Sequence, residues 1–479
     1  MGQRLTLKFG GTSVGSAEAI RQAAAIVVDL RRRGHDVVVV TSAMSGVTDL
    51  LLGSAAAAVS GDRLKVVEHT ASIRAKHEGA ADALGLTGDE RHLALDPITA
   101  RLGELSLLCD ALAVLGEASP RALDAVGALG ERMSIHLLAA ALRREGAVAH
   151  PVDAARVVRT DDTFQAAVPL MDETTRLAAH ELGPLVAAGE VPVVTGFIGA
   201  TADGVVTTLG RGGSDYSGAI IGAATGSDEV WIYTDVDGVM TADPRVVRGV
   251  RTLESLSYLE MSELAYFGAK VLHPKTILPA LERGIPIRIK NTFNPGHPGT
   301  LVVGRSEGDR ALKGVTAIRA QTLITIAGRG MLGVPGIAAR AFGAVARTGT
   351  SVTMISQASS EQSICFLVAD RSATTVLEAL RREFHHELDR RDIEDISSLA
   401  PVVIVTVVGG AIKQTPGVAG RIFGALGTAE INVIAIAMGS SECSISLVVA
   451  SADADLAVQA LHDLIAAAPA PTTAQVPGP

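Results

Sequence analysis

The strongest constraint on the fold is an internal repeat in the C-terminal part of the chain. Pro335-Gly336 recurs as Pro416-Gly417, and the surrounding residues stay in step, so that Arg340 returns as Arg421. Each copy predicts a strand, a glycine turn, a helix, two strands and a second helix. Two small units of this kind can join their sheets and form ligand sites between equivalent surfaces, so the duplication favours a binding module over a second catalytic centre. The alternative is that both copies are purely structural.

Before the repeat, short apolar runs alternate with longer segments of helical period. This alternation predicts an α/β fold, with an open and mostly parallel sheet covered by helices on both faces. The predicted strands, each followed by Gly, Ser, Thr or Asp, are residues 6–9, 37–41, 191–195 and 230–234. Ligands collect at the carboxyl ends of strands in such sheets, so we expect the chemistry there. The Ala- and Leu-rich stretch 48–130 predicts an inserted helical section that forms one wall of a substrate cleft.

These patterns divide the chain into a predicted α/β domain over residues 1–305 and two α+β units over residues 318–398 and 401–466. The turn-rich residues 293–300 mark the exit from the first domain. Residues 467–479 are rich in Ala and Pro and predict a disordered tail.

Composition narrows the functional classes. The net charge is −9 and no basic stripe is present, so nucleic-acid binding is not expected. Cys109, Cys365 and Cys443 lie far apart without a C-x-x-C spacing, which predicts reduced and mostly buried thiols. The N-terminus lacks the layout of a signal peptide, and the apolar runs are too short to span a bilayer. We therefore expect a cytoplasmic protein that does not bind a membrane.

The first candidate site follows the first predicted strand. Lys8, Gly10, Gly11 and Ser13 belong to the sequence Lys-Phe-Gly-Gly-Thr-Ser, which presents a cation and bare glycine amides before a predicted helix. Such a turn can hold a phosphate chain at a helix N-terminus, and the alternative is a tight turn with a surface lysine. Because no G-x-x-x-x-G-K-[ST] sequence occurs, a Walker-type nucleotide site is excluded.

A second glycine loop lies at residues 210–215, with the sequence Gly-Arg-Gly-Gly-Ser-Asp. The guanidinium group of Arg211 suits the bidentate capture of a carboxylate, and Asp215 could align Lys8 across the cleft. The plainer alternative is that Ser214 or Asp215 caps the following helix. We favour a functional loop, because two such loops in one domain serve no packing purpose.

Two further segments offer partners for a nucleotide. The loop from Thr234 and Asp235 to Arg245 clusters three aspartates and an arginine, which could bind ribose hydroxyls and phosphates or simply form turns. Lys270 lies in the sequence Gly-Ala-Lys-Val-Leu-His-Pro and adds a second lysine for phosphates.

Two other motifs are rejected as cofactor or metal sites. The sequence Gly-Arg-Gly-Met-Leu-Gly at residues 328–333 matches a dinucleotide fingerprint, but the segment about 20 residues further on lacks the acidic residue that would hold a ribose. The His-His-Glu tract at residues 385–387 is typical of a solvated helix face. We therefore predict neither an NAD site nor a metal site in the chain.

Taken together, these segments resemble the aspartate kinase family. The resemblance rests on residues 8–13, Gly130-Glu131, residues 210–215, the Thr234-Asp235 loop and the sequence Phe-Gly-Ala-Lys-Val-Leu-His-Pro at residues 267–274. The repeat is similar to the paired ACT domains of these kinases, and the chain looks closest to the kinase part of the bifunctional aspartate kinase/homoserine dehydrogenases. The resemblance implies an amino-acid-kinase fold followed by two ACT domains of the βαββαβ type.

The resemblance also implies roles for individual residues. The residues that it places at ATP are Lys8, Gly10, Gly11, Ser13, Thr234, Asp235, Met240, Arg245, Lys270 and Val271. The residues that it places at aspartate are Thr48, Glu131, Arg211, Gly213 and Ser214. The glutamate would take the ammonium group and the arginine a carboxylate. The catalytic residues would be Lys8, Arg211 and Asp215, with Asp215 orienting Lys8. Met240 stands where the family often has tyrosine.

The implied reaction is the ATP-dependent phosphorylation of the side-chain carboxylate of L-aspartate. It yields ADP and 4-phospho-L-aspartate, the entry to lysine, threonine and methionine synthesis. The carboxylate, with a pKa of about 4, is already an anionic nucleophile at neutral pH, so no general base is needed. Phosphoryl transfer instead needs charge neutralisation and in-line placement, which lysines, glycine amides and Mg²⁺ can supply.

The ACT repeat implies feedback by an amino acid. We expect threonine first and lysine second as the effector, at half-sites that contain Gln357 and Met438. At the position of Met438 the family often has glutamine. A homodimer or a larger assembly through the ACT domains is also expected. Two alternatives remain: another amino-acid kinase of the same fold, which would accept glutamate or acetylglutamate, and a catalytically inactive amino-acid sensor.

Overall fold

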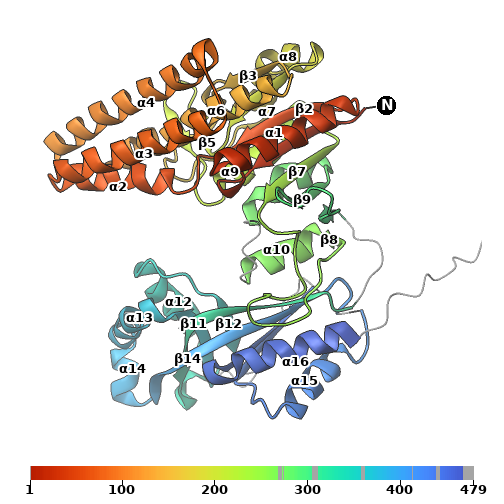
Figure 1. The fold of residues 1–479 in the computed structure, drawn as a ribbon. Coiled ribbons are helices and arrows are strands. Elements are labelled where there is room, and N and C mark those ends of the chain that lie inside the picture. The colour runs from red at the N-terminus through yellow and green to blue at the C-terminus, as the bar shows by residue number, and fades with distance from the viewer. Residues whose placement is uncertain are drawn as a thin grey trace, which may run out of the picture. The chain divides into compact units, whose positions relative to one another are not determined.

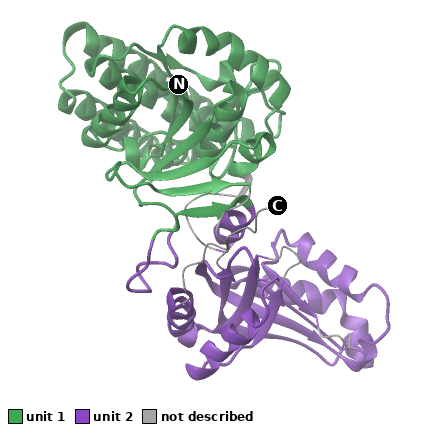
Figure 2. Cartoon of the chain, turned by 90° about the vertical axis from the view of Figure 1, so that its right-hand side faces the viewer, with its two compact units in different colours: residues 1–239, 252–258, 270–305 green, residues 240–251, 259–269, 306–479 purple. Residues whose placement is uncertain are grey.

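The chain folds into two compact units (Figure 2). The first contains residues 1–239, 252–258 and 270–305, and the second contains residues 240–251, 259–269 and 306–479. Each unit has hydrophobic cores of its own. The computed structural model describes residues 2–267, 272, 274–304, 311–357, 362–412, 414–438 and 443–467.

An eight-stranded sheet forms the centre of the first unit, with the strand order β3-β4-β2-β1-β7-β9-β10-β8. Its strands are β1 (Arg4–Phe9), β2 (Asp36–Thr41), β3 (Ala149–Val152), β4 (Val191–Thr195), β7 (Glu229–Thr234), β8 (Ser255–Ser257), β9 (Ile287–Asn291) and β10 (Thr300–Val303). Neighbouring strands run parallel except β9 and β10. The four predicted strands are confirmed as β1, β2, β4 and β7, and the α/β fold class is confirmed with them.

Helices cover both faces of this sheet (Figure 1). Strand β2 shows the reason, because its valines are buried and alternate side chains enter two separate hydrophobic cores. Val37 packs with residues of α1 (Ala17–Arg32) and α6 (Leu129–Arg144), whereas Val38 packs with residues of α9 (Gly213–Thr225). Strands buried on both faces are typical of parallel sheets.

Helix α9 approaches the sheet closely because glycines lie on its inner face. A Cβ atom at Gly222 would lie 2.3 Å from a methyl group of Val230 on β7, and one at Gly218 would lie 3.0 Å from the Cβ of Lys8. Larger residues at these positions would push the helix away from the sheet. The glycines therefore allow the first turns of α9 to lie beside the end of β1.

The Ala- and Leu-rich stretch is helical, as predicted. It contains α2 (Val47–Val59), α3 (Arg63–Ala83), α4 (Gly88–Leu115) and α5 (Pro120–Gly127). The other helices of the first unit are α7 (Met171–Glu181), α8 (Gly183–Ala187) and α11 (Leu278–Arg283). A small antiparallel sheet joins β5 (Ile198–Ala200) to β6 (Val206–Thr208).

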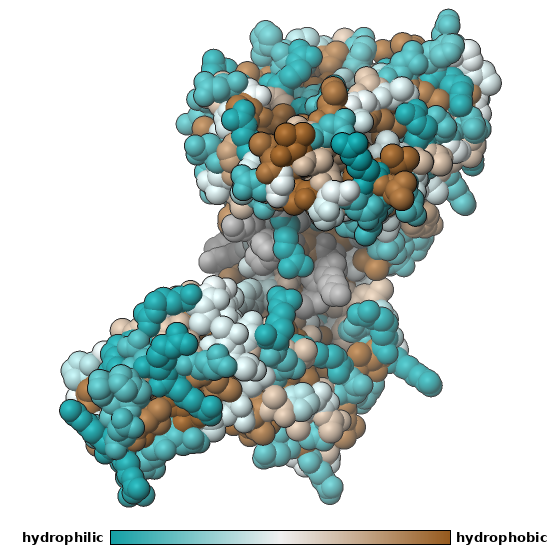
Figure 3. All heavy atoms as spheres, turned by 90° about the vertical axis from the view of Figure 1, so that its left-hand side faces the viewer, coloured by the Kyte–Doolittle hydropathy of each residue, from teal (hydrophilic) through white to brown (hydrophobic). Residues whose placement is uncertain are grey.

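One helical stretch in the described part of the chain, Pro120–Arg144, is long and apolar enough to cross a membrane by length and composition alone. It covers α5 and α6, and 83% of its apolar window is buried inside the protein. Buried core helices pass the same test, so this stretch is weak evidence for a membrane span. On the face shown in Figure 3, hydrophobic side chains lie in small groups among hydrophilic ones.

A six-stranded sheet forms the centre of the second unit, with the order β12-β13-β11-β14-β16-β15 and antiparallel pairing. Its strands are β11 (Gly314–Ala327), β12 (Met354–Gln357), β13 (Ser363–Ala369), β14 (Asp395–Val408), β15 (Ala435–Met438) and β16 (Ser444–Ala450). The helices are α10 (Tyr258–Tyr266), whose first residue belongs to the first unit, α12 (Ile337–Arg347), α13 (Asp370–Glu383), α14 (His385–Arg390), α15 (Val418–Thr428) and α16 (Ala454–Ala467). The predicted order of strands and helices in each copy is confirmed. Residues 468–479 of the predicted tail lie outside the described residues.

The two copies of the repeat share their longest strands. Residues 314–318 of β11 pair with residues 404–408 of β14, and residues 323–327 pair with residues 395–399. An irregularity separates the two halves, near Ala320 with its φ of 55°. Residues 314–318, which precede the first copy, therefore add a strand segment to the second copy, and residues 395–399 add one to the first.

Residues 240–251 belong to the second unit, although they follow strand β7 of the first. Ala242 and Val247 join the hydrophobic core of the second repeat copy. The buried hydroxyl group of Thr241 lies 2.9 Å from Nε2 of His462 on α16. Part of the predicted nucleotide loop is thus built into the unit that carries the repeat.

Candidate active site

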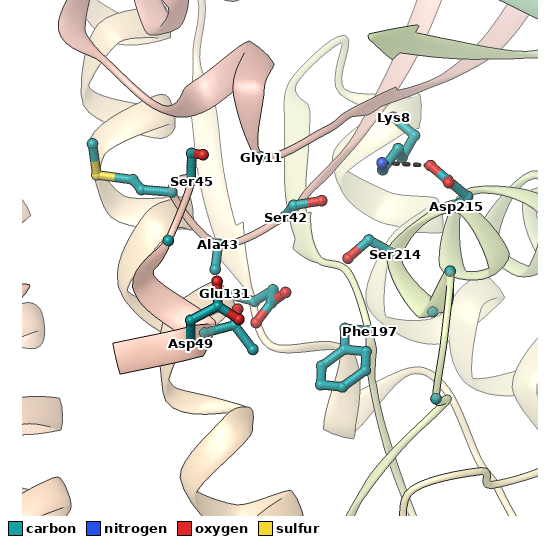
Figure 4. A pocket seen from close by; sticks show the side chains of 16 residues that line it. Lys8, Gly11, Ser42, Ala43, Ser45, Asp49, Glu131, Phe197, Ser214 and Asp215 are labelled. Atoms are coloured by element: carbon teal, nitrogen blue, oxygen red, sulfur yellow. Dashed lines mark ion pairs between the residues drawn. The ribbon is translucent and has the colours of Figure 1, made fainter. Parts of the chain in front are cut away.

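Lys8 and Asp215, which are predicted to be catalytic, face each other as expected. Lys8 is the penultimate residue of β1 and has only 5% of its surface exposed. Its Nζ forms an ion pair with Oδ1 of Asp215 in the first turn of α9 (Figure 4). The alternative that Ser214 or Asp215 caps α9 is wrong, because Gly212 occupies the N-cap position and no side chain caps the helix. The carboxylate of Asp215 is therefore available to hold the ammonium group of Lys8.

A cavity of about 380 Å³ opens beside this ion pair, at the carboxyl ends of the strands (Figure 4). Its lining residues are Lys8, Gly11, Ser42, Ala43, Met44, Ser45, Gly46, Thr48, Asp49, Glu131, Phe197, Gly210, Gly212, Gly213, Ser214 and Asp215. The structure thus brings together seven of the predicted residues: Lys8, Gly11, Thr48, Glu131, Gly213, Ser214 and Asp215. They come from both glycine loops, the helical insertion and α6.

Glu131 is the most unusual group in the cavity. It lies in the first turn of α6 with 3% of its surface exposed, and its Oε2 has no hydrogen-bond partner. Burial raises the pKa of Glu131 to about 7, although the backbone of Ala43, the charge of Lys8 and the hydroxyl group of Ser214 act in the opposite direction. A buried carboxylate with an unused oxygen is suited to receive a cationic group from a ligand.

The neighbouring residue explains how Glu131 reaches this position. A Cβ atom at Gly130 would lie 2.8 Å from the side chain of Ala43, so a larger residue would separate α6 from the loop after β2. The Gly130-Glu131 pair therefore has a packing reason as well as a chemical one.

The remaining residues of the first glycine loop are held by hydrogen bonds. Gly10 donates its N–H to the carbonyl of Tyr233 at 3.1 Å. Ser13 is buried; its hydroxyl donates to the same carbonyl at 3.2 Å and accepts from Thr292 at 2.6 Å. Neither Gly10 nor Ser13 lines the cavity. Ser13 holds the loop in place, and its predicted contact with a nucleotide stays a prediction.

Arg211 does not line the cavity in which it was predicted to lie. Its side chain is exposed and is absent from the cavity lining, although Gly210 and Gly212 on both sides line it. Among the described residues no ion pair with Arg211 is present. Its guanidinium group is therefore available for a ligand but is not placed at one.

The predicted nucleotide residues are divided between the two units. Thr234 ends β7 in the first unit and Asp235 follows it, and the hydroxyl of Thr234 donates to Oδ1 of Asp235 at 3.1 Å. Met240 and Arg245 belong to the second unit, where Arg245 forms an ion pair with Asp243 at 2.7 Å. The predicted nucleotide contacts Lys270 and Val271 lie outside the described residues.

Phe197 and residues 42–46 also line the cavity and were not predicted from the sequence. Phe197 follows β4 in a left-handed conformation, with a φ of 65°, and its ring lies against Gly213. Residues 42–46 follow β2. Both segments begin at the carboxyl end of a predicted strand, so the rule that ligands collect there was the signal that could have found them.

The second unit has a cavity of about 330 Å³ in the first repeat copy. It is lined by Met331, Gly333, Val334, Pro335, Gly336, Ile337, Ala338, Gln357 and Ile364. The predicted effector residue Gln357 therefore lies in a cavity beside the repeated Pro-Gly sequence. Met438, its counterpart on β15, is 64% exposed.

A mostly parallel sheet with one glycine loop after β1, a second glycine loop after β6, and a cavity with a buried cation and carboxylates together fit the amino acid kinase class. The sequence profile of the amino acid kinase family matches residues 3–291. The profile of the ACT domain matches residues 324–384 and 405–464, which lie in the two repeat copies.

Similar proteins narrow this class. The chain is 38% identical to the bifunctional aspartokinase/homoserine dehydrogenase 1, chloroplastic, of Arabidopsis thaliana, over 95% of this chain and 50% of that protein. It is 34% identical to aspartokinase 1, chloroplastic, of the same plant, over 95% of this chain and 79% of that protein. The chain belongs to the aspartokinase (aspartate kinase) family. It spans about half the length of the bifunctional curated relatives that it matches.

Solved structures agree with this assignment. The structure of Escherichia coli aspartokinase III in complex with aspartate and ADP has a TM-score of 0.78 and 32% sequence identity, over 96% of this chain and 99% of that one. The complex of the same enzyme with lysine and aspartate has a TM-score of 0.79 over the same shares. The expected family and the tandem ACT domains are confirmed.

Proposed function

We propose that the chain is an aspartate kinase that converts ATP and L-aspartate into ADP and 4-phospho-L-aspartate. The observation that carries the proposal is the cavity in which the Lys8–Asp215 ion pair faces the carboxylate of Glu131, whose Oε2 has no partner. One side suits an anionic phosphate and the other suits an ammonium group. The name of the similar E. coli complex, with aspartate and ADP, is consistent with both ligands.

Aspartate would bind by its charges. Oε2 of Glu131 would accept the α-ammonium group, and the guanidinium of Arg211 would turn inward to bind a carboxylate in a bidentate manner. Thr48, Gly213 and Ser214 would supply polar contacts from the cavity wall. The side-chain carboxylate would then point toward Lys8.

The transfer step needs little from the protein beyond placement and charge. An oxygen of the aspartate side chain forms a bond to the γ-phosphorus while the bond from that phosphorus to the β,γ-bridging oxygen breaks, and ADP leaves with the electron pair. Lys8 would neutralise charge on the transferring group, and Asp215 would keep the ammonium group of Lys8 in position. Because aspartate attacks as an anion, no residue has to remove a proton.

Mg²⁺ would accompany the nucleotide and neutralise its phosphates. Among the described residues no group of three or more His, Cys, Asp and Glu side chains could hold a metal ion. This fits Mg²⁺, which is commonly bound through phosphate oxygens and few protein ligands. Thr234, Asp235 and Lys8 would be the nearest polar residues to such a nucleotide, with Lys270 as a further candidate.

The test of this proposal is ADP release from ATP and Mg²⁺ with L-aspartate, glutamate or acetylglutamate as the acceptor. Of these three acceptors, we expect only L-aspartate to give ADP release. Lys8→Ala should lower kcat about 10²- to 10³-fold, as expected for the loss of one group that stabilises the transition state. Lys65→Ala, an exposed lysine on α3, is the control and should leave kcat unchanged. No ADP above the aspartate-free background would point instead to another acceptor or to an inactive amino-acid sensor.

We further propose that the ACT pair binds an amino acid as a feedback inhibitor, threonine first and lysine second, in the cavity beside Gln357. An effector acts only through unequal affinity for two states, so it should favour a less active arrangement. Inhibition by millimolar threonine or lysine would support this. Activity unchanged by both amino acids would contradict it, and Met438 would then be the first position to examine.

Association through the ACT domains forms part of the same proposal. Strands β12 and β15 are the edges of the six-stranded sheet and expose Ile355, Ile436 and Met438. Exposed edge strands with apolar side chains are ready to pair with another copy. The plant relatives carry chloroplastic names, and a cytoplasmic location stays a proposal for this chain.

A further inference from the structure

Asp124 is a buried carboxylate that lies outside the cavity. It belongs to α5, only 1% of its surface is exposed, and it does not line the cavity. Both of its oxygens accept hydrogen bonds from two distant segments. The backbone N–H of Gln165 donates at 3.0 and 3.1 Å, the N–H of Thr208 at 2.9 Å, and the hydroxyl of Thr208 at 2.7 Å.

Burying a carboxylate costs free energy unless hydrogen bonds within the protein replace those to water. A buried carboxylate requires several donors to offset the loss of water, and among the described residues no cation pairs with Asp124. If the carboxylate were removed, the buried backbone N–H of Thr208 and the part-buried N–H of Gln165 would lose their acceptor. Asp124 therefore serves to fix the backbone at Gln165 and Thr208.

Both of these residues flank the start of the second glycine loop. Thr208 ends β6, two positions before Gly210. A Cβ atom at Gly210 would lie 2.7 Å from the carbonyl oxygen of Gln165, which itself has a φ of 67°. The N–H of Ala167 also donates to the carbonyl of Thr208 at 3.0 Å. The segment around Gln165 and the end of β6 are thus held together against Gly210.

We propose that Asp124 is a positioning residue that fixes the loop of residues 210–215 at the mouth of the aspartate subsite. The geometry acts through Thr208 and Gln165 on Gly210, and from there on the adjacent Arg211. This inference rests on the proposed function, because it assigns the loop to aspartate rather than to ATP. Loss of the hydrogen bonds to Asp124 should raise the KM for aspartate more than the KM for ATP.

The matched pair for a test is Thr208→Val and Thr207→Val. Both threonines are buried on β6, and each hydroxyl makes one short hydrogen bond to another side chain: Thr208 to Asp124, and Thr207 to Thr160 at 2.6 Å. Thr208→Val should raise the KM for aspartate about five- to tenfold, less than the full value of one hydrogen bond to a charged group, because the loss acts on the loop indirectly. Thr207→Val should stay within about twofold of the parent, and Thr208→Ser should restore the parent value.

Asp124→Asn provides a second variant, because its amide group would face a donor and break one contact without emptying the site. We expect a larger rise in the KM for aspartate than in Thr208→Val, with the KM for ATP within about twofold. Equal effects of Thr208→Val and Thr207→Val, or equal rises in both KM values, would overturn the inference.

Amide hydrogen exchange over residues 209–215 tests, independently of activity, whether Asp124 fixes the backbone of this loop. Exchange should be faster in Thr208→Val than in Thr207→Val, and equal rates would overturn the inference. An unmutated chain that releases no ADP with aspartate would instead contradict the proposed function, while the exchange measurement would still decide whether Asp124 fixes the loop.

Discussion

At the scale of single residues, Glu131 carries the clearest prediction about pH. Burial raises its pKa to about 7, so a growing share of the carboxyl groups in the empty site is protonated as the pH falls below 7. A protonated carboxyl attracts an ammonium group far less than a carboxylate does. The KM for aspartate should therefore rise as the pH falls, by about tenfold per unit well below pH 7, because one proton must be released on binding.

The measurement is the KM for aspartate between pH 5.5 and 8.5, with the KM for ATP as the internal control. Glu131→Gln should have a high KM for aspartate that changes little over this range, since the amide does not titrate. A parent enzyme whose KM for aspartate is flat across pH 7 would show that Glu131 does not bind the ammonium group.

At the scale of elements, the contact between α9 and β7 depends on Gly222. A Cβ atom there would lie 2.3 Å from Val230, so Gly222→Ala overpacks a buried interface and should lower the free energy of unfolding by about 1–3 kcal/mol. Gly79→Ala on α3 is the matched control, because that helical glycine is exposed and faces open space. It should instead raise the free energy of unfolding by about 0.5–1 kcal/mol through helix propensity.

Both changes can be followed by urea unfolding with the fluorescence of Trp231, the single tryptophan of the chain, which lies in the first unit. Equal stability changes in Gly222→Ala and Gly79→Ala would mean that α9 can move away from the sheet without cost.

Helix α6 also carries His136, whose titration affects the stability of the fold. Burial, followed by the charges of Arg101 and Arg143, lowers the pKa of His136 from 6.5 to about 4. Between pH 6.5 and 4, His136 is therefore protonated in the unfolded chain but largely neutral in the folded chain. The folded state should lose stability as the pH falls through this window, by at most about 3 kcal/mol from this group.

The comparison of His136→Gln with the parent isolates this contribution from the carboxylates that titrate in the same range. The parent should lose more stability than His136→Gln between pH 6.5 and 4, measured by the same tryptophan signal. His180→Gln, at a histidine whose side chain is 81% exposed, should behave like the parent. Parallel pH profiles for the parent and His136→Gln would contradict the prediction.

At the scale of the whole molecule, the edge strands of the six-stranded sheet predict how copies associate. Ile436 on β15 is 44% exposed, and a lysine there would place a charge on a surface that we propose to be buried in a dimer. Analytical ultracentrifugation should find a dimer or a larger assembly for the parent and a shift toward monomer for Ile436→Lys. Leu64→Lys, at an 85% exposed residue on α3, should leave the assembly unchanged. An Ile436→Lys protein that sediments like the parent would exclude this edge.

The fold was largely predictable from the sequence because its signals are local. The apolar runs of β1, β2, β4 and β7 identify the strands, since each must be buried on both faces of a parallel sheet. The repeat is recognisable because equivalent residues such as Pro335 and Pro416 recur with the same spacing to their neighbours. The contribution of residues 314–318 of β11 to the second copy was not predictable, because strand pairing depends on contacts far apart in the chain.

The candidate site was predictable only in part. Motif residues such as Lys8 and Asp215 were found because a cation and a carboxylate in glycine loops have few structural uses. Phe197 and Asp124 were missed, because a single aromatic residue and a single aspartate in a helix carry no chemical pattern of their own. Arg211 was assigned to the site by its chemistry, yet it is exposed and outside the cavity lining.

The sequence by itself determined the strands β1, β2, β4 and β7, the repeat and the two glycine loops, because these follow from periodicity, spacing and the side chains of neighbouring residues. Only the tertiary structure decided which of these groups meet. It brought Glu131 of α6 into one cavity with Lys8 and left its Oε2 without a partner. It also placed residues 240–251 in the repeat unit. The physical reason is that the environment of a charge, and hence its pKa and use, depends on residues that fold around it from elsewhere in the chain.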